Sequence, residues 1–166
     1  MYCCEATAVI EDPHLMITNV SGNHLPDLGL ADVEYLRISN QKEIKFLPIN
    51  IAEYFPNLKK IVVKHTKLKY ITENDFLGLT QLTAMFMTNN KLKELPWGVF
   101  QTNNKLEEIN FEDSYLNKIG ADVFKPLALL RKAHFRNNDC IHKDAEETSE
   151  VTGLLEKIAK KNFHQL

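Results

Sequence analysis

Hydrophobic residues recur along this chain with a period of 24 residues. Leu58, Leu82 and Leu106 mark the period, and apolar residues follow each of them three and five positions later. The same spacing begins again at Leu130 but stops soon afterwards, and upstream it begins at Val33 with one extra residue. Self-similarity at a fixed period of this size is typical of stacked structural repeats. The pattern therefore predicts four complete repeats and one partial repeat over residues 33–141.

Each repeat reads LxxLxLxxNxLxxLxxxxFxxLxx, which is identified as the pattern of a leucine-rich repeat. Alternate apolar residues such as Ile61 and Val63 predict a short strand with one buried face. Stacking would place these strands in parallel along a curved inner sheet. Phe76, Phe100 and Phe124 recur in the returning half and predict an aromatic spine. We expect an α/β leucine-rich repeat solenoid, in which neighbouring repeats stabilise one another.

Polar side chains follow each predicted strand, where the chain has to turn. Asn90 and Asn138 can bond the peptide groups of a neighbouring turn, which would otherwise stay unpaired in a buried loop. The equivalent positions hold Thr66, Ser114 and Gln41. We therefore expect an asparagine ladder that is only partial.

The two ends of the chain carry different patterns and predict caps for an open solenoid. Within residues 1–32, two apolar runs flank Glu11-Asp12-Pro13-His14, which is typical of a β-hairpin. Within residues 142–166, apolar residues fall at helical spacing after Ser149, a candidate N-cap. These apolar residues are Val151, Leu154, Leu155, Ile158 and Ala159. We expect a single domain, 1–166, with a hairpin cap and a helical cap.

The solvent-facing residues of the inner strands are the candidate partner-binding site. They comprise Arg37, Val62, Lys64, His65, Phe86, Thr88, Asn110, Glu112, Asp113, His134 and Arg136. Val62 and Phe86 are adjacent apolar residues on a face that should be solvated, which indicates a contact site. Charge also changes sign from repeat to repeat, which suits a partner protein of complementary charge. The alternatives are lateral packing of the apolar pair and sideways ion pairs between the fourth and fifth repeats.

Composition and motifs exclude several classes of function. A net charge of −2 gives no reason to expect a nucleic-acid partner, and no apolar run is long enough to span a membrane. No basic segment followed by an apolar run begins the chain, so we expect either a cytosolic protein or one whose leader was removed. The six histidines lack metal-ligand spacing, and no nucleotide or nucleophile motif occurs. We expect no metal, no cofactor, no catalytic residue and no enzyme activity.

Three cysteines leave one unpaired if two form a disulfide, and the third could join two chains into a dimer. Cys3 and Cys4 lie in the N-terminal cap, whereas Cys140 lies at the last repeat. An arc of repeats separates them, so a bridge between Cys3 and Cys140 is geometrically unfavourable, and a bond between adjacent cysteines is strained. The other interpretation is that all three are reduced.

The chain resembles the short extracellular leucine-rich repeat proteins of animals, most closely the secreted immune proteins of insects such as mosquitoes. The resemblance rests on the 24-residue spacing, the Phe at the nineteenth position and the ending Asn137-Asn138-Asp139-Cys140-Ile141. It implies secretion and a role in recognition or complex assembly through another protein. The chain departs from that group in having too few cysteines for disulfide caps and no coiled-coil tail. An intracellular adaptor with the same geometry is the alternative.

Overall fold

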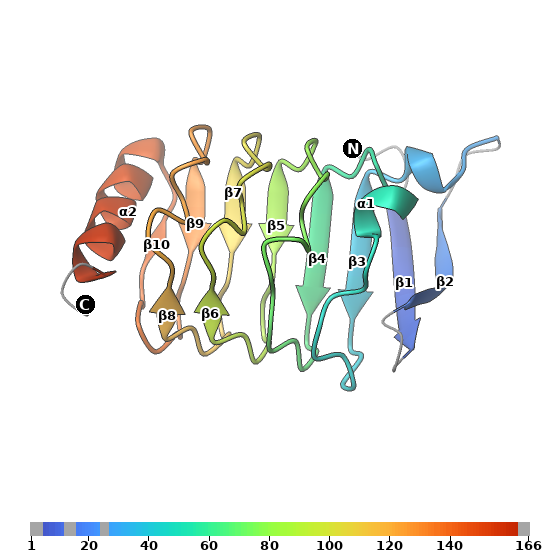
Figure 1. Ribbon diagram of the computed structural model, residues 1–166, viewed down its shortest axis with the longest axis horizontal. Coiled ribbons are helices and arrows are strands. Elements are labelled where there is room, and N and C mark those ends of the chain that lie inside the picture. The colour runs from blue at the N-terminus through green and yellow to red at the C-terminus, as the bar shows by residue number, and fades with distance from the viewer. Residues whose placement is uncertain (1–4, 12–15, 24–26, 163–166) are drawn as a thin grey trace.

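The chain folds as a solenoid of stacked turns in this computed structural model, which describes residues 5–11, 16–23 and 27–162 (Figure 1). Strands form one long wall of the solenoid, and turns with short strands and a short helix form the opposite wall. The elements of the first half are β1 (Glu5–Glu11), β2 (Met16–Asn23), η1 (Leu30–Asp32), β3 (Tyr35–Ser39), α1 (Ile51–Tyr54), β4 (Lys60–Lys64) and β5 (Ala84–Phe86). Those of the second half are β6 (Glu94–Leu95), β7 (Glu108–Asn110), β8 (Lys118–Ile119), β9 (Lys132–His134), β10 (Asp144–Ala145) and α2 (Thr148–Asn162).

One eight-stranded sheet runs the length of the solenoid in the order β10-β9-β7-β5-β4-β3-β1-β2. The strands from β3 to β9 pair in parallel, and the same repeat position stays in register from turn to turn: Ile61 pairs with Met85, and Met85 with Ile109. A second sheet of β6 and β8 lies on the opposite wall. The predicted parallel inner sheet is confirmed.

The core lies between the two walls and is built from the repeated apolar positions. Alternate residues of a strand point to opposite faces, so Leu36, Ile61 and Met85 are fully buried while their neighbours face out. Phe76, Phe100 and Phe124 stack as predicted, with ring centroids 6.4 and 6.1 Å apart. Each buried side chain of this size contributes about 1.5–3 kcal/mol before the loss of entropy.

Buried polar side chains tie each turn to the next. The Asn90 amide donates to Val63 O at 2.9 Å, and its Oδ1 accepts from the Thr66 hydroxyl at 2.7 Å. Two turns further, the Asn138 amide donates to Phe111 O at 2.8 Å. Ser114 donates to Met87 O in the turn between them. The ladder is therefore continuous although only two of its members here are asparagines.

Asn103 is a buried polar residue that the repeat pattern does not predict. It occupies the position held by Leu79 and Leu127 in the flanking repeats. Its amide donates to Phe76 O and to Leu79 O, at 3.1 and 3.0 Å. It thus adds a second tie between turns on the outer wall, away from the predicted ladder.

Both caps have the predicted element type. β1 and β2 pair antiparallel and extend the sheet, since β1 also pairs with β3; the expected turn residues 12–15 lie outside the described residues. At the other end, α2 packs on β9 and β10, and Val151, Leu154 and Ile158 are buried against the last repeat. The helix begins at Thr148, so the expectation that Ser149 is its N-cap is wrong. The Glu150 carboxylate instead accepts the Glu146 N–H there at 3.0 Å.

Candidate functional site

The solvent-facing side of the eight-stranded sheet, which we call the concave face, carries most of the predicted binding residues. Register places Arg37, Val62, Phe86, Asn110 and His134 in one row across five strands. Each lies between two buried neighbours in the sequence, as the alternation predicts. Lys64, Thr88, Glu112 and Arg136 form the next row toward the ends of the strands. The structure therefore brings these candidates together on one surface.

Aromatic rings and cations form a cluster at the N-terminal half of this face. The Lys60 ammonium lies 4.4 Å from the centroid of the Phe86 ring and 5.5 Å from that of Tyr35. The Arg37 guanidinium donates to the Tyr35 hydroxyl at 2.5 Å. Such cation–π contacts hold long charged side chains in place. We call Tyr35, Arg37, Lys60, Val62 and Phe86 the aromatic–cation cluster.

Val62 is less exposed than predicted. It was expected to be an exposed apolar residue beside Phe86, but only 7% of it is exposed. In register it lies between Arg37 and Phe86, whose larger side chains leave it little contact with water. Phe86 is half-buried and remains the accessible apolar group of the pair. Lateral packing therefore accounts for Val62.

The sequence interpretation omitted Tyr35, although it belongs to the cluster. Tyr35 lies directly beside Lys60 in register, two residues before Arg37 on the same face of β3. The signal that could have revealed it is the two-residue alternation continued one step before the first inward leucine. Only 9% of Tyr35 is exposed, so its part in the cluster is to hold Arg37 and Lys60 in place and not to provide a contact surface of its own.

Charged residues at the C-terminal half of the concave face pair largely with one another. His134 lies 4.0 Å from a Glu108 carboxylate oxygen and 3.7 Å from one of Glu146. Just before the same two strands, at the edge of the sheet, Arg131 and Glu107 approach to 3.9 Å. Sideways pairing between the fourth and fifth repeats, one of the two sequence interpretations, therefore occurs. The Arg131–Glu107 pair is exposed, and pairs of that kind contribute about 0–1 kcal/mol each.

Glu112 and Arg136 lie in the same row of the fourth and fifth repeats, but each pairs with another residue. Arg136 bonds Asp144 of β10, and the Glu112 carboxylate accepts from the Asn110 amide at 3.0 Å. These partners come from the C-terminal cap and from the same strand, respectively. The charge left available on this half of the face is smaller than the sequence suggests.

His65 and Asp113 lie at the edge of the sheet, not on its face. They belong to a row of five turn residues with φ near +60°, namely Asn40, His65, Asn89, Asp113 and Asn137. A left-handed residue ends the strand and directs the chain around the edge of the solenoid. Asn, Asp and His are enriched in this conformation. The sequence interpretation placed this row on the concave face because it took the residues directly after Lys64 and Glu112 as a third outward-facing row.

One carboxyl group on the outer wall has an altered acidity. Asp75 occupies the position of Ile51 and Val99 in the flanking repeats, and burial raises the pKa of its carboxyl above the ordinary value of 3.8. The Thr72 N–H donates to Oδ2 at 2.6 Å and opposes this effect only in part. Asp75 is thus a polar substitution at an inward position, on the wall opposite the candidate site.

The described residues include no group of three or more His, Cys, Asp or Glu side chains that could hold a metal ion. Likewise, no helix in residues 5–11, 16–23 and 27–162 is long and apolar enough to cross a membrane. Cys140 is half-buried, and Cys3 and Cys4 lie outside the described residues, so the pairing of the cysteines stays a prediction.

Comparison with known families supports the assignment of the repeats. Residues 31–92, which include β3, β4 and β5, match the family described as leucine rich repeat. The fold is a leucine-rich repeat solenoid. The same 24-residue spacing and the same register continue to β9, beyond the matched residues. None of the curated proteins matches the chain. A leucine-rich repeat domain indicates a protein-interaction module, because its regular walls present an extended binding surface.

Proposed function

We propose that this leucine-rich repeat protein is a non-catalytic recognition or complex-assembly protein that binds another protein through its concave face. The observation that supports this most directly is the aromatic–cation cluster around Phe86. Arg and aromatic residues are enriched at protein interfaces, and Arg37 and Phe86 are partly exposed members of this cluster. Asn110 beside Phe86 in the same row, with Thr88 and Glu112 in the next row, supplies hydrogen-bonding groups around this anchor.

We further propose that the protein is secreted and acts in insect innate immunity. The support is the resemblance to the secreted insect proteins in three features: the repeat period, the position of the phenylalanine and the segment 137–141 that ends the repeats. In that setting an unpaired cysteine would be available to link two chains. Mass spectrometry of the native, unreduced protein tests this part: a disulfide or a covalent dimer is expected, and three free thiols would contradict it.

The concave face is tested by capture of partners from insect haemolymph and from a cytosolic extract, followed by cross-linking to locate the contact. A Phe86→Glu, Glu112→Lys double variant should lose the haemolymph partner. A matched control is Leu77→Glu, Glu73→Lys, which makes the same two kinds of change at exposed residues of the outer wall. The control should retain the partner.

Equal capture by wild type and both double variants would indicate that the partner binds outside the concave face. Capture from the cytosolic extract alone would instead favour the intracellular adaptor. Circular dichroism of both variants should show that the fold is kept, since none of the four residues belongs to the core.

A further inference from the structure

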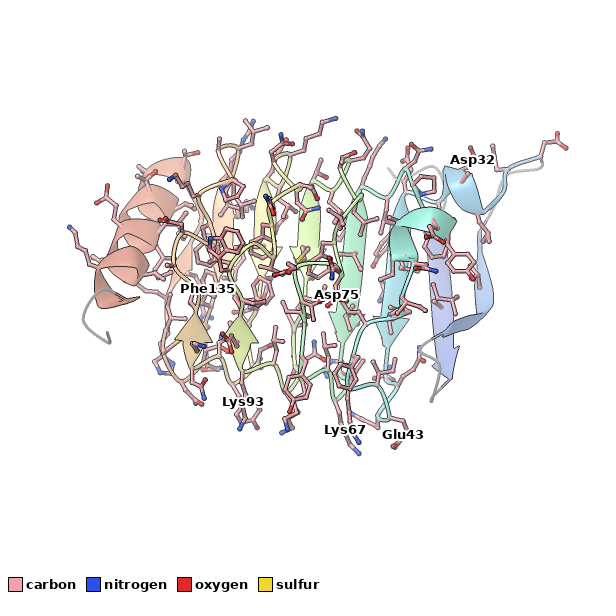
Figure 2. All side chains as sticks on the ribbon, viewed as in Figure 1. Asp32, Glu43, Lys67, Asp75, Lys93 and Phe135 are labelled. Carbon is pink, nitrogen blue, oxygen red and sulfur yellow. The ribbon has the colours of Figure 1, made fainter. Side chains whose placement is uncertain are left out.

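The lower edge of the solenoid carries two rows of lysines that the proposed concave site does not use. Lys42, Lys67 and Lys91 recur just after the strands, and Lys45, Lys69 and Lys93 follow on the same edge. The rows are aligned by the backbone, because the Lys69 N–H donates to Lys45 O and the Lys91 N–H to Leu68 O. Figure 2 shows Lys67 and Lys93 projecting from this edge into solvent. We call these six residues the lysine edge.

Charge on the lysine edge is mostly uncompensated. Within the described chain, Lys67 alone of the six forms an ion pair, with the strongly exposed Glu43 at 3.9 Å. The opposite edge of the solenoid differs. There Lys59 meets Glu34 at 2.6 Å, and Arg131 meets Glu107 at 3.9 Å. Two cations of that edge are thus paired with carboxylates, whereas five of the six lysines of the lysine edge form no ion pair among the described residues.

A trough of about 540 Å³ runs along the lysine edge across the turns from Lys42 to Asn137. Parallel strands lie about 4.8 Å apart, so four spacings make the trough about 19 Å long. That length holds about six residues of an extended polypeptide, which rises about 3.3 Å per residue. Asn89 and Asn137 line the trough and provide amides that can bond peptide groups.

Exposed aromatic rings accompany the lysines. The Lys91 ammonium lies 4.2 Å from the centroid of the Tyr115 ring, at the wall of the trough. Phe46 and Tyr70 stack with centroids 5.2 Å apart, and both are more than two-fifths exposed. A binding partner could therefore gain apolar contact as well as charge pairing on this edge.

We propose that the lysine edge binds an extended acidic segment of a partner protein. Complementary charge supplies the attraction, and the trough supplies the shape for a single polypeptide strand. The Asp113 carboxylate lines the same trough, and Glu43 lies at its edge. A polyanion with a charge on every unit would place some of its charges against Asp113 and Glu43. A peptide can instead place its acidic residues beside the lysines and its polar residues beside Asp113.

This surface is separate from the concave face, so its test does not depend on the proposed function. The probe is a fluorescein-labelled peptide of about twelve residues in which glutamates alternate with serine and tyrosine. Fluorescence anisotropy should show saturable binding at about 50 mM salt that weakens at about 300 mM, where screening is stronger. The same peptide with glutamine in place of glutamate should not bind.

The edge variant is Lys42→Glu, Lys67→Glu, Lys91→Glu. It should bind the acidic peptide at least about tenfold more weakly, because three attractive contacts become repulsive. The matched control, Lys105→Glu, Lys125→Glu, Lys157→Glu, reverses three exposed lysines elsewhere and has the same net charge. It should keep its affinity, as should the concave variant Phe86→Glu, Glu112→Lys.

Heparin and phosphatidylserine vesicles are the competing probes. Absence of peptide binding, or an equal loss in the edge variant and its control, would overturn the proposal. It would also be overturned if heparin or the vesicles bound through these lysines more tightly than the peptide, since the edge would then recognise a glycan or a lipid surface.

Discussion

The Lys60 ammonium lies 4.4 Å above the ring of Phe86, on the diagonal between two neighbouring strands. This contact orders the accessible part of the concave face and keeps a cation beside its main apolar group. The two residues are one strand apart in space, although 26 positions separate them in the sequence. The binding surface is thus organised by side chains from different repeats.

The first prediction concerns that contact. A double-mutant cycle of Lys60→Gln and Phe86→Leu, measured by urea denaturation, should give a coupling energy of about 0.5–1 kcal/mol, the range for exposed cation–π pairs. The cycle isolates this pair from the other contacts of Lys60. A coupling near zero would mean that water solvates the ammonium and that the ring is not held by it.

Asn90 should be among the least replaceable polar residues. Its Asn90→Ala variant leaves Val63 O and the Thr66 hydroxyl without their buried partner. Each orphaned group costs about 1–3 kcal/mol, so the free energy of unfolding should fall by about 3 kcal/mol. The exposed Asn117→Ala change is the control, with an effect within about 0.5 kcal/mol. Similar losses for both would show that the ladder contributes little.

Phe100 is the middle of the aromatic spine and touches rings on both sides. Phe100→Ala should lower the free energy of unfolding by about 3–5 kcal/mol, because a cavity opens between two repeats. Phe46→Ala removes an exposed ring of the same kind and should cost about 1 kcal/mol, the value of its stacking on Tyr70. Both variants are compared by chemical denaturation. Equal losses of unfolding free energy would contradict a special stabilising role of the aromatic spine.

Asp75 should make stability depend on pH. Because burial raises its pKa in the folded state, the folded protein holds this proton more tightly than the unfolded chain. Stability from this group is present at low pH and is lost as pH rises from the unfolded pKa through the folded pKa. Asp75→Asn keeps an acceptor for Thr72 and should be more stable than wild type at pH 7, with the difference vanishing below about pH 4. A difference in unfolding free energy between Asp75→Asn and wild type that is the same at all pH values would refute this.

Two glycines should respond in opposite directions to alanine. A Cβ on Gly120 would lie 2.6 Å from Trp97 N, so Gly120→Ala should destabilise the fold by about 1–3 kcal/mol. Gly153 has no atom within 4 Å of such a Cβ and lies inside α2, so Gly153→Ala should stabilise the protein by up to about 1 kcal/mol. Thermal unfolding of both variants checks the two signs together.

Much of the fold could be predicted because the same apolar positions recur in every repeat. The spacing that places Leu58, Leu82 and Leu106 on one line also places the strands in parallel, and only stacking buries every apolar position. The candidate site was harder to predict. Alternation identified the face on which Phe86 lies, but the exposure of Val62 depends on the size of its neighbours in adjacent strands.

The sequence by itself determined the period, the inward positions, the phenylalanine spine and the places where Asn90 and Asn138 bond the next turn. These features recur along the chain, so the 24-residue sequence pattern is enough to predict them. Only the tertiary structure decided which side chains are accessible and how they pair. Arg136 meets Asp144 and His134 meets Glu146 because the chain after the last repeat folds back beside β9. Left-handed turns place His65 and Asp113 on the edge, since φ near +60° ends the alternation of the strand. Lateral contact and turn geometry, which no single repeat encodes, therefore shape the binding surfaces.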